Sequence, residues 1–172
     1  MQDRTTPNNA AFRMSLAKEI EWYGDLALIM AGCHREASDK YGNTHIWFGL
    51  PAAILASISG ISAFTQYSKV AGITAFVVAG ITGAMSFLNP AEKEKLHFEA
   101  GNVLDAWAAK TYLLKKQTIA GLIEPAKLIS EWRKLMDERS QLQRQSPRIP
   151  TWARSRKLKE RLLHPFEASE SE

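Results

Sequence analysis

The sequence predicts an all-α membrane protein in which a two-helix transmembrane hairpin has long cytosolic amphipathic helices before and after it. Residues 43–91 carry no formal charge except Lys69, whereas the flanking segments are strongly polar. A bilayer core of ~30 Å needs about 20 apolar residues of helix, and the uncharged stretch supplies that length twice, at about 46–67 and 70–89. We therefore expect a cytosolic N-terminal amphipathic helix at 1–45, the hairpin at 46–89, cytosolic helices at 90–145 and a basic, flexible tail at 146–172.

The alternative for the uncharged stretch is a pair of buried helices in a soluble bundle. A long core helix of a soluble protein normally keeps a polar stripe toward water. Neither apolar segment has a charged stripe, and this favours the membrane, with the lipid bilayer as the first partner of the chain.

Basic residues near the apolar segments predict the orientation of the hairpin. Arg35 and Lys40 precede it and Lys93 and Lys95 follow it, against Lys69 alone in the turn. Because Lys and Arg concentrate in cytoplasmic loops, both termini are expected in the cytoplasm. The chain is thus expected to be a multi-pass protein of the cell (inner) membrane.

Each apolar segment has one bulky face and one face of small or polar side chains. The bulky faces contain Leu50, Ile54, Ile58, Ile61 and Phe64, and then Ile73, Phe76, Val77, Ile81, Met85, Phe87 and Leu88. Bulky faces suit lipid, whereas small residues let helix backbones approach and hydroxyl or amide groups bond across the seam. The small faces should therefore pack against protein, either sealing the hairpin and a simple dimer or lining the pore of a homo-oligomer. The packing or pore-facing candidates are Ala52, Ala56, Ser59, Gly60, Ser62, Ala63, Gln66, Ala75, Ala79, Thr82, Gly83 and Ser86.

Residues at alternating steps of four and three predict a packing seam on the cytosolic helix before the hairpin and on the first one after it, and the last helix is expected to be amphipathic. We expect disorder at 1–11, a helix at about 12–41, a break at Gly42-Asn43, and Pro51 one turn into the first span, where its missing N–H costs least. Asn89 is the expected N-cap and Pro90 the first residue of a helix reaching about residue 123, before a further helix at about 125–144. The seam residues are Leu16, Ile20, Tyr23, Ala27, Met30, His34, Ala37 and Tyr41, and then His97, Ala100, Leu104, Trp107, Thr111 and Leu114. The apolar side of the last helix contains Leu128, Ile129, Trp132, Leu135, Met136 and Leu142.

The motif H-x-E-A occurs twice, beginning at His34 and at His97. Both histidines are expected roughly 10 to 20 Å above the membrane, where they could face each other. They are either packing residues hydrogen-bonded within a helical interface or a pH-sensitive contact that relays motion to a pore. The cytosolic coupling candidates are His34, Ala37, Tyr41, His97 and Ala100.

No residue set in the sequence points to catalysis, a cofactor or a metal. A Gly-rich phosphate loop, a Ser/His/Asp set and a carboxylate dyad are all missing, so we expect no enzyme and no cofactor. A zinc site is not expected either, because the single cysteine, Cys33, forms no His-Cys cluster with metal spacing.

The segment 148–161 contains six basic residues and one acidic residue. It could be a solvated tail, a juxtamembrane segment attracted to anionic lipid, or a patch for a phosphate-bearing ligand or nucleic acid. The chain's pI of about 9.2 comes mainly from the C-terminal half. This does not by itself argue for nucleic acid, which is not an expected partner.

The order of these features resembles the SLATT family, the two-transmembrane effectors associated with bacterial nucleotide-signalling conflict systems. The resemblance rests on His34, Ala37 and Tyr41 before the hairpin, on F-L-N-P-A-E at 87–92, and on His97 and Ala100 after it, and it covers about 12–114. It implies a pore-forming anti-phage effector that permeabilises the cell membrane. The implied partner is an enzyme that makes a nucleotide second messenger, or a sensor protein.

Two other functions are compatible with the residues alone. One is a non-conducting membrane scaffold that recruits partners through its cytosolic helices. The other is a soluble helical adaptor.

Overall fold

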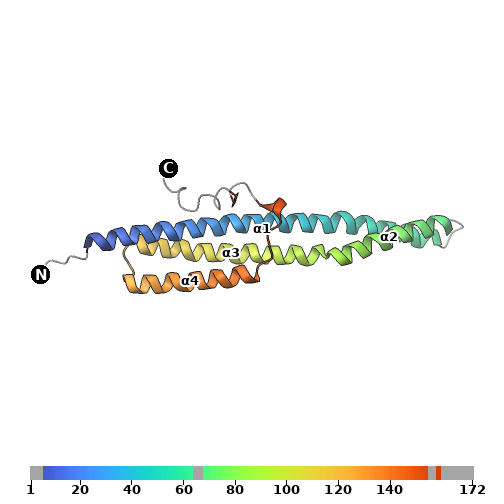
Figure 1. Ribbon diagram of the computed structural model, residues 1–172. Coiled ribbons are helices and arrows are strands. Elements are labelled where there is room, and N and C mark those ends of the chain that lie inside the picture. Colours follow the sequence, from blue (N-terminus) through green and yellow to red (C-terminus); the bar gives the residue numbers. More distant parts are fainter. Residues whose placement is uncertain (1–5, 64–67, 155–157, 160–172) are drawn as a thin grey trace. The chain divides into compact units, whose positions relative to one another are not determined.

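The computed structural model describes residues 6–63, 68–154 and 158–159, and their regular structure is helical (Figure 1). The elements are α1 (Thr6–Ala63), α2 (Ser68–Leu88), α3 (Pro90–Ile119), α4 (Pro125–Gln145) and a short 3-10 helix, η1 (Thr151–Ala153). The prediction of an all-α protein is confirmed for the described residues. The chain divides into two compact units: Met1–Glu36 with His97–Glu172 form unit 1, and Ala37–Leu96 form unit 2.

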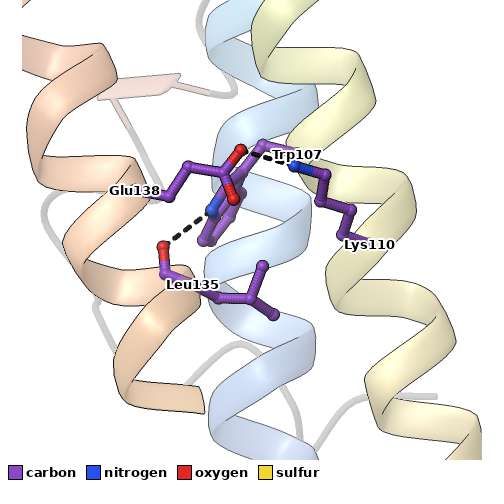
Figure 2. Close-up of polar contacts among 4 residues, drawn as sticks. All are labelled: Trp107, Lys110, Leu135 and Glu138. Carbon is purple, nitrogen blue, oxygen red and sulfur yellow. Dashed lines mark hydrogen bonds and ion pairs between the residues drawn. The ribbon is translucent and has the colours of Figure 1, made fainter. Parts of the chain in front are cut away.

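Unit 1 is built around the seams that the sequence predicts. The indole N–H of Trp107 donates to the carbonyl of Leu135 at 2.8 Å, and Lys110 pairs with Glu138 beside it (Figure 2). Fully burying a side chain as large as leucine or isoleucine contributes about 1.5 to 3 kcal/mol to stability. Ile129, predicted on the apolar side of the last helix, is 38% exposed and does not pack into this core. The buried cluster consists of Leu16, Ile20, Ala27, Ala31, Leu104, Trp107, Ala108, Leu114, Leu128 and Trp132.

Helix α1 starts earlier than predicted. Residues 6–11, predicted as disordered, are helical, while residues 1–5 lie outside the described part. Pro7 stands in the first turn, where a missing N–H costs nothing. The guanidinium of Arg13 donates to the carbonyl of Ile123 at 2.7 Å. This contact satisfies a carbonyl group just beyond the end of α3, and it holds the first turns of α1 against the segment that follows α3.

The predicted break at Gly42-Asn43 is wrong, because α1 continues through both residues. A Cβ at position 42 would lie 2.8 Å from the carboxyl group of Glu94. Gly42 therefore permits a close approach within unit 2 rather than ending a helix. The continuous helix also puts Pro51 in its interior instead of its first turn, where it has no N–H to donate to the carbonyl of Trp47.

Asn89 separates α2 from α3 in a left-handed conformation, with φ of 42°. Its N–H donates to the carbonyl of Met85 at 2.9 Å and its carbonyl accepts from the N–H of Lys93 at 3.3 Å. Its side-chain amide donates to the carboxylate of Glu92. The prediction of Asn89 as an N-cap is therefore partly wrong, because its side chain bonds the side chain of Glu92 and not a backbone N–H of α3. Asn89 also ends α2 in the left-handed conformation, which asparagine tolerates.

Helix α3 ends at Ile119, four residues before the predicted end. Gly121 has φ of 69°, the N–H of Leu122 donates to the carbonyl of Gln117, and the N–H of Gly121 donates to that of Thr118. This is a Schellman ending, which requires a residue that adopts positive φ. The following helix, predicted at about 125–144, is confirmed as α4.

The segment after α4 packs into unit 1. Ile149, Ala153 and Leu158 are all buried, and both the N–H and the hydroxyl of Ser146 donate to the carbonyl of Leu142. A solvated tail is therefore the wrong description of these positions. The remaining predicted tail residues, 155–157 and 160–172, lie outside the described residues.

Candidate functional site

Unit 2 exposes large apolar side chains along both of its apolar helices. Two helices of the chain are long and apolar enough to cross a membrane, and their most apolar windows are 6% and 0% buried. A core helix of a soluble protein passes the same test of length and composition, but such a helix is mostly buried. Phe76 is 83% and Phe87 90% exposed, which is unusual for side chains that face water.

The two helices of unit 2 meet through residues of mixed size. The hydroxyl of Ser59 in α1 donates to the carbonyl of Ala71 in α2 at 3.0 Å. Ala52 is buried and Ser62 half-buried, so three predicted packing residues of α1 lie on this face. Within 46–62 and 69–88 the other partly buried positions are Gly49 and Leu55 in α1 and Ala71, Thr74, Val78, Ile81 and Met85 in α2.

Ile81 and Met85 correct the sequence prediction, which put both on a lipid-facing surface. Both are half-buried within unit 2. With Ala71, Thr74 and Val78 they recur at steps of three and four, so a search for a seam of any side-chain size would have found them. Side-chain size alone does not predict this face, because the face contains both small and bulky residues.

Apart from Ala71, the small residues predicted to pack in α2 lie elsewhere on the helix. We call Ala75, Ala79, Thr82, Gly83 and Ser86 the small face of α2, and all five are exposed. In α1, the predicted residues Ala56 and Gly60 are exposed as well. A Cβ added at Gly60 or Gly83 would meet no atom of the described residues within 4 Å.

Two of the predicted packing residues are not placed. Gln66 lies outside the described residues, and so does the side chain of Ala63. Both stay predictions.

Unit 1 brings His34 of α1 and His97 of α3 into contact, as the repeated motif predicted they could be. Their Nδ1 atoms lie 2.9 Å apart and their side chains are 1% and 4% exposed. Burial, and then the charge of His97, lower the pKa of His34 to about 4, and burial lowers the pKa of His97. At neutral pH both rings are therefore neutral, and one donates its Nδ1–H to the lone pair of the other.

A glycine permits the close approach of the helices that carry the histidines. A Cβ at Gly101 would lie 3.3 Å from the carbonyl of Ala31 and 3.7 Å from the Cβ of His34. Ala100, another coupling candidate, is buried beside it. On the more solvent-exposed side of this contact, Arg35 forms an ion pair with Asp105.

The two remaining coupling candidates, Ala37 and Tyr41, belong to unit 2. Ala37 is fully buried, and the hydroxyl of Ser38 next to it donates to the carbonyl of Glu94 at 3.0 Å. The ammonium group of Lys93 lies 5.7 Å from the centre of the Tyr41 ring, within reach of a cation–π interaction. The five candidates are thus divided between the two units.

These sites offer binding and packing chemistry: a neutral histidine pair in unit 1, and exposed small and bulky helix faces in unit 2. The bulky faces match the solvent properties of hydrocarbon, and the small faces match a second helix. No protein-family model, curated protein or solved structure matches the chain.

Proposed function

We propose that the chain crosses the cell membrane as a hairpin of two spans, at about 46–67 and 70–89, and assembles through its small faces into a pore. Support for the spans comes from the length of the apolar helices and the near absence of burial along them. Support for the assembly comes from the exposed small face of α2, which is the observation that carries the proposal.

The contact between α1 and α2 does not use this face. The hydroxyls of Ser59 and Thr74 donate to backbone carbonyls, whereas within the described residues Thr82 and Ser86 have no hydrogen-bond partner for theirs. A hydroxyl group left unbonded in hydrocarbon costs free energy. Contact with a second copy of the chain, or with water in a pore, removes that cost.

The resemblance to the SLATT family supplies the biological part of the proposal. In it, a partner enzyme makes a nucleotide second messenger or a sensor protein signals infection, and the cytosolic helices transmit this to the hairpin. His34, Ala37, Tyr41, His97 and Ala100 are the proposed coupling residues. The open pore would permeabilise the cell membrane and arrest or kill the infected cell.

The test is release of a trapped dye from liposomes that contain the purified full chain at increasing protein-to-lipid ratio. Gly83→Leu places a bulky side chain on the small face of α2, so we expect it to abolish both cross-linked oligomers and dye release. Ala84→Leu is the control, because Ala84 is also exposed but lies among the bulky residues Val77, Phe87 and Leu88 at helical spacing, away from the small face. Equal effects of the two substitutions on cross-linking would refute assembly through the small face, and oligomers that stay tight at every protein-to-lipid ratio would refute a pore that opens by assembly alone.

A non-conducting scaffold is the second candidate, and unit 1 has surface features that favour it. Large apolar side chains of α3 are exposed there, including Phe98 at 54%, Tyr112 at 59% and Leu113 at 58%. Such side chains suit a partner protein. In that case substitutions at these positions would abolish function while no ion flux is ever measured.

A further inference from the structure

An open cavity of about 460 Å³ lies in unit 1. Its walls come from α1, α3, α4 and the segment that follows α4. Leu26, Leu104 and Leu158, which are all buried, contribute an apolar part. A cavity of this volume falls within the range of small-molecule sites, which are about 300 to 1,000 Å³.

Three arginines also line the cavity: Arg139 from α4, and Arg148 and Arg154 from the segment after it. The packing of Ile149 and Ala153 fixes that segment, and the bonds of Ser146 to the last turn of α4 fix where it starts. The two arginines are thus carried by a folded segment and not by a free tail.

Among the described residues, no carboxylate neutralises these arginines. None of the described lining residues is Asp or Glu, and none of the three guanidinium groups forms an ion pair with a described residue. Arg139 lies 4.9 Å from the ring centre of Tyr23 and 5.9 Å from that of Trp107. Burial lowers the pKa of Arg139, so a bound anion would offset part of what its burial costs.

We propose that this cavity binds a phosphorylated small molecule, with Arg139, Arg148 and Arg154 holding its phosphate groups and the apolar wall holding the rest. Guanidinium forks match phosphate oxygens in geometry and charge. Three arginines without an ion pair to any described residue suit a ligand of more than one negative charge. The phosphate belongs either to a soluble compound or to a lipid headgroup. The proposal goes beyond the pore and does not depend on it, because binding is measured without any flux.

The test is calorimetric titration of the full chain in detergent, at constant ionic strength, with ATP, pyrophosphate and dihexanoyl phosphatidic acid as separate probes. Arg148→Gln/Arg154→Gln should weaken binding about tenfold or more, because each lost charged hydrogen bond is costly. Arg133→Gln/Arg144→Gln, which removes the same charge from exposed positions of α4 outside the cavity, should leave binding within about twofold.

A second pair of variants removes no packing group. Gln143→Glu puts a carboxylate on the cavity wall and should weaken binding, whereas Gln141→Glu, outside the wall, should not. Binding of ATP or pyrophosphate identifies a soluble ligand, and binding of phosphatidic acid alone identifies a lipid headgroup. Failure of all three probes to bind, or equal loss in the cavity variants and their controls, would overturn the proposal.

Discussion

The Nδ1 atoms of His34 and His97 lie 2.9 Å apart inside unit 1. One hydrogen is shared between two nitrogens, so at least one ring must present a lone pair. The contact therefore persists when neither ring or one ring is charged, but not when both are. The repeated motif has two interpretations, packing and a pH-sensitive contact, and this geometry is compatible with both. Packing holds at pH values where at most one ring is charged, and the pH-sensitive behaviour begins where both rings become charged.

Stability should fall as pH falls. The pKa of His34 drops from an ordinary 6.5 to about 4 on folding, so between these values the unfolded chain binds more protons than the folded one. The contribution of neutral His34 to the free energy of unfolding is then fully present above pH 6.5. It is lost progressively as pH falls toward 4, by on the order of 3 kcal/mol. Thermal unfolding in detergent, followed by the fluorescence of Trp107 and the other tryptophans, measures it.

The matched variants are His34→Gln and His45→Gln. His34→Gln removes the buried titrating ring and should flatten the pH dependence between 4 and 6.5, even if it lowers stability at pH 7. His45 is exposed, so its substitution should leave the dependence unchanged. An unaltered pH profile in His34→Gln would show that another group is responsible.

Two glycines of α1 should respond oppositely to alanine. A Cβ at Gly24 would lie 2.7 Å from the hydroxyl of the buried Thr111, whose position is fixed by a hydrogen bond to Ala108. Gly24→Ala should therefore destabilise by about 1 to 3 kcal/mol through overpacking. No described atom lies within 4 Å of a Cβ at Gly32, so Gly32→Ala should stabilise the helix by about 0.5 to 1 kcal/mol. Denaturant unfolding compares them, and a shift of the same sign in both would contradict the packing described for Gly24.

The contacts in Figure 2 should differ greatly in their contribution to stability. Trp107→Phe removes a buried N–H bond to Leu135 and part of the core volume, so it should cost about 1 to 3 kcal/mol. Lys110→Met breaks only a surface ion pair with Glu138, which should change stability by less than about 1 kcal/mol. Unfolding midpoints of the two variants give the comparison. Equal losses would mean that the ion pair is more important than its exposure suggests.

The helices of unit 1 could be predicted from the sequence because their seams follow the helical period. Residues such as Ile20, Leu104 and Trp107 recur at steps of three and four and are buried. The ends of the helices were less predictable. Gly42 looks like a breaker, but its role depends on Glu94, a residue distant in sequence. Local propensity contains no information about such a contact.

The candidate sites show the same limit. Matching motifs indicated that His34 and His97 could meet, since each stands on a seam. A patch for a phosphate-bearing ligand is one of three interpretations of the segment with Arg148 and Arg154, but the cavity that they form with Arg139 could not be predicted, because the same charge suits a solvated tail. The buried residues Ile149 and Ala153 hold that segment in place, but they are too few and too irregularly spaced to show a period.

A charge at the middle of α2 should separate a membrane protein from a soluble one. Phe76 stands near the middle of α2 and is 83% exposed. An arginine at the centre of a spanning helix costs about 2.5 to 3.5 kcal/mol of insertion free energy, so Phe76→Arg should reduce the amount of chain that resists alkaline extraction from membranes. Phe98→Arg, at an exposed position of unit 1, is the control and should leave membrane insertion intact. In a soluble helical adaptor both arginines would face water and improve solubility, so wild-type chain in the cytosolic fraction, with Phe76→Arg more soluble still, would eliminate the hairpin and the pore together.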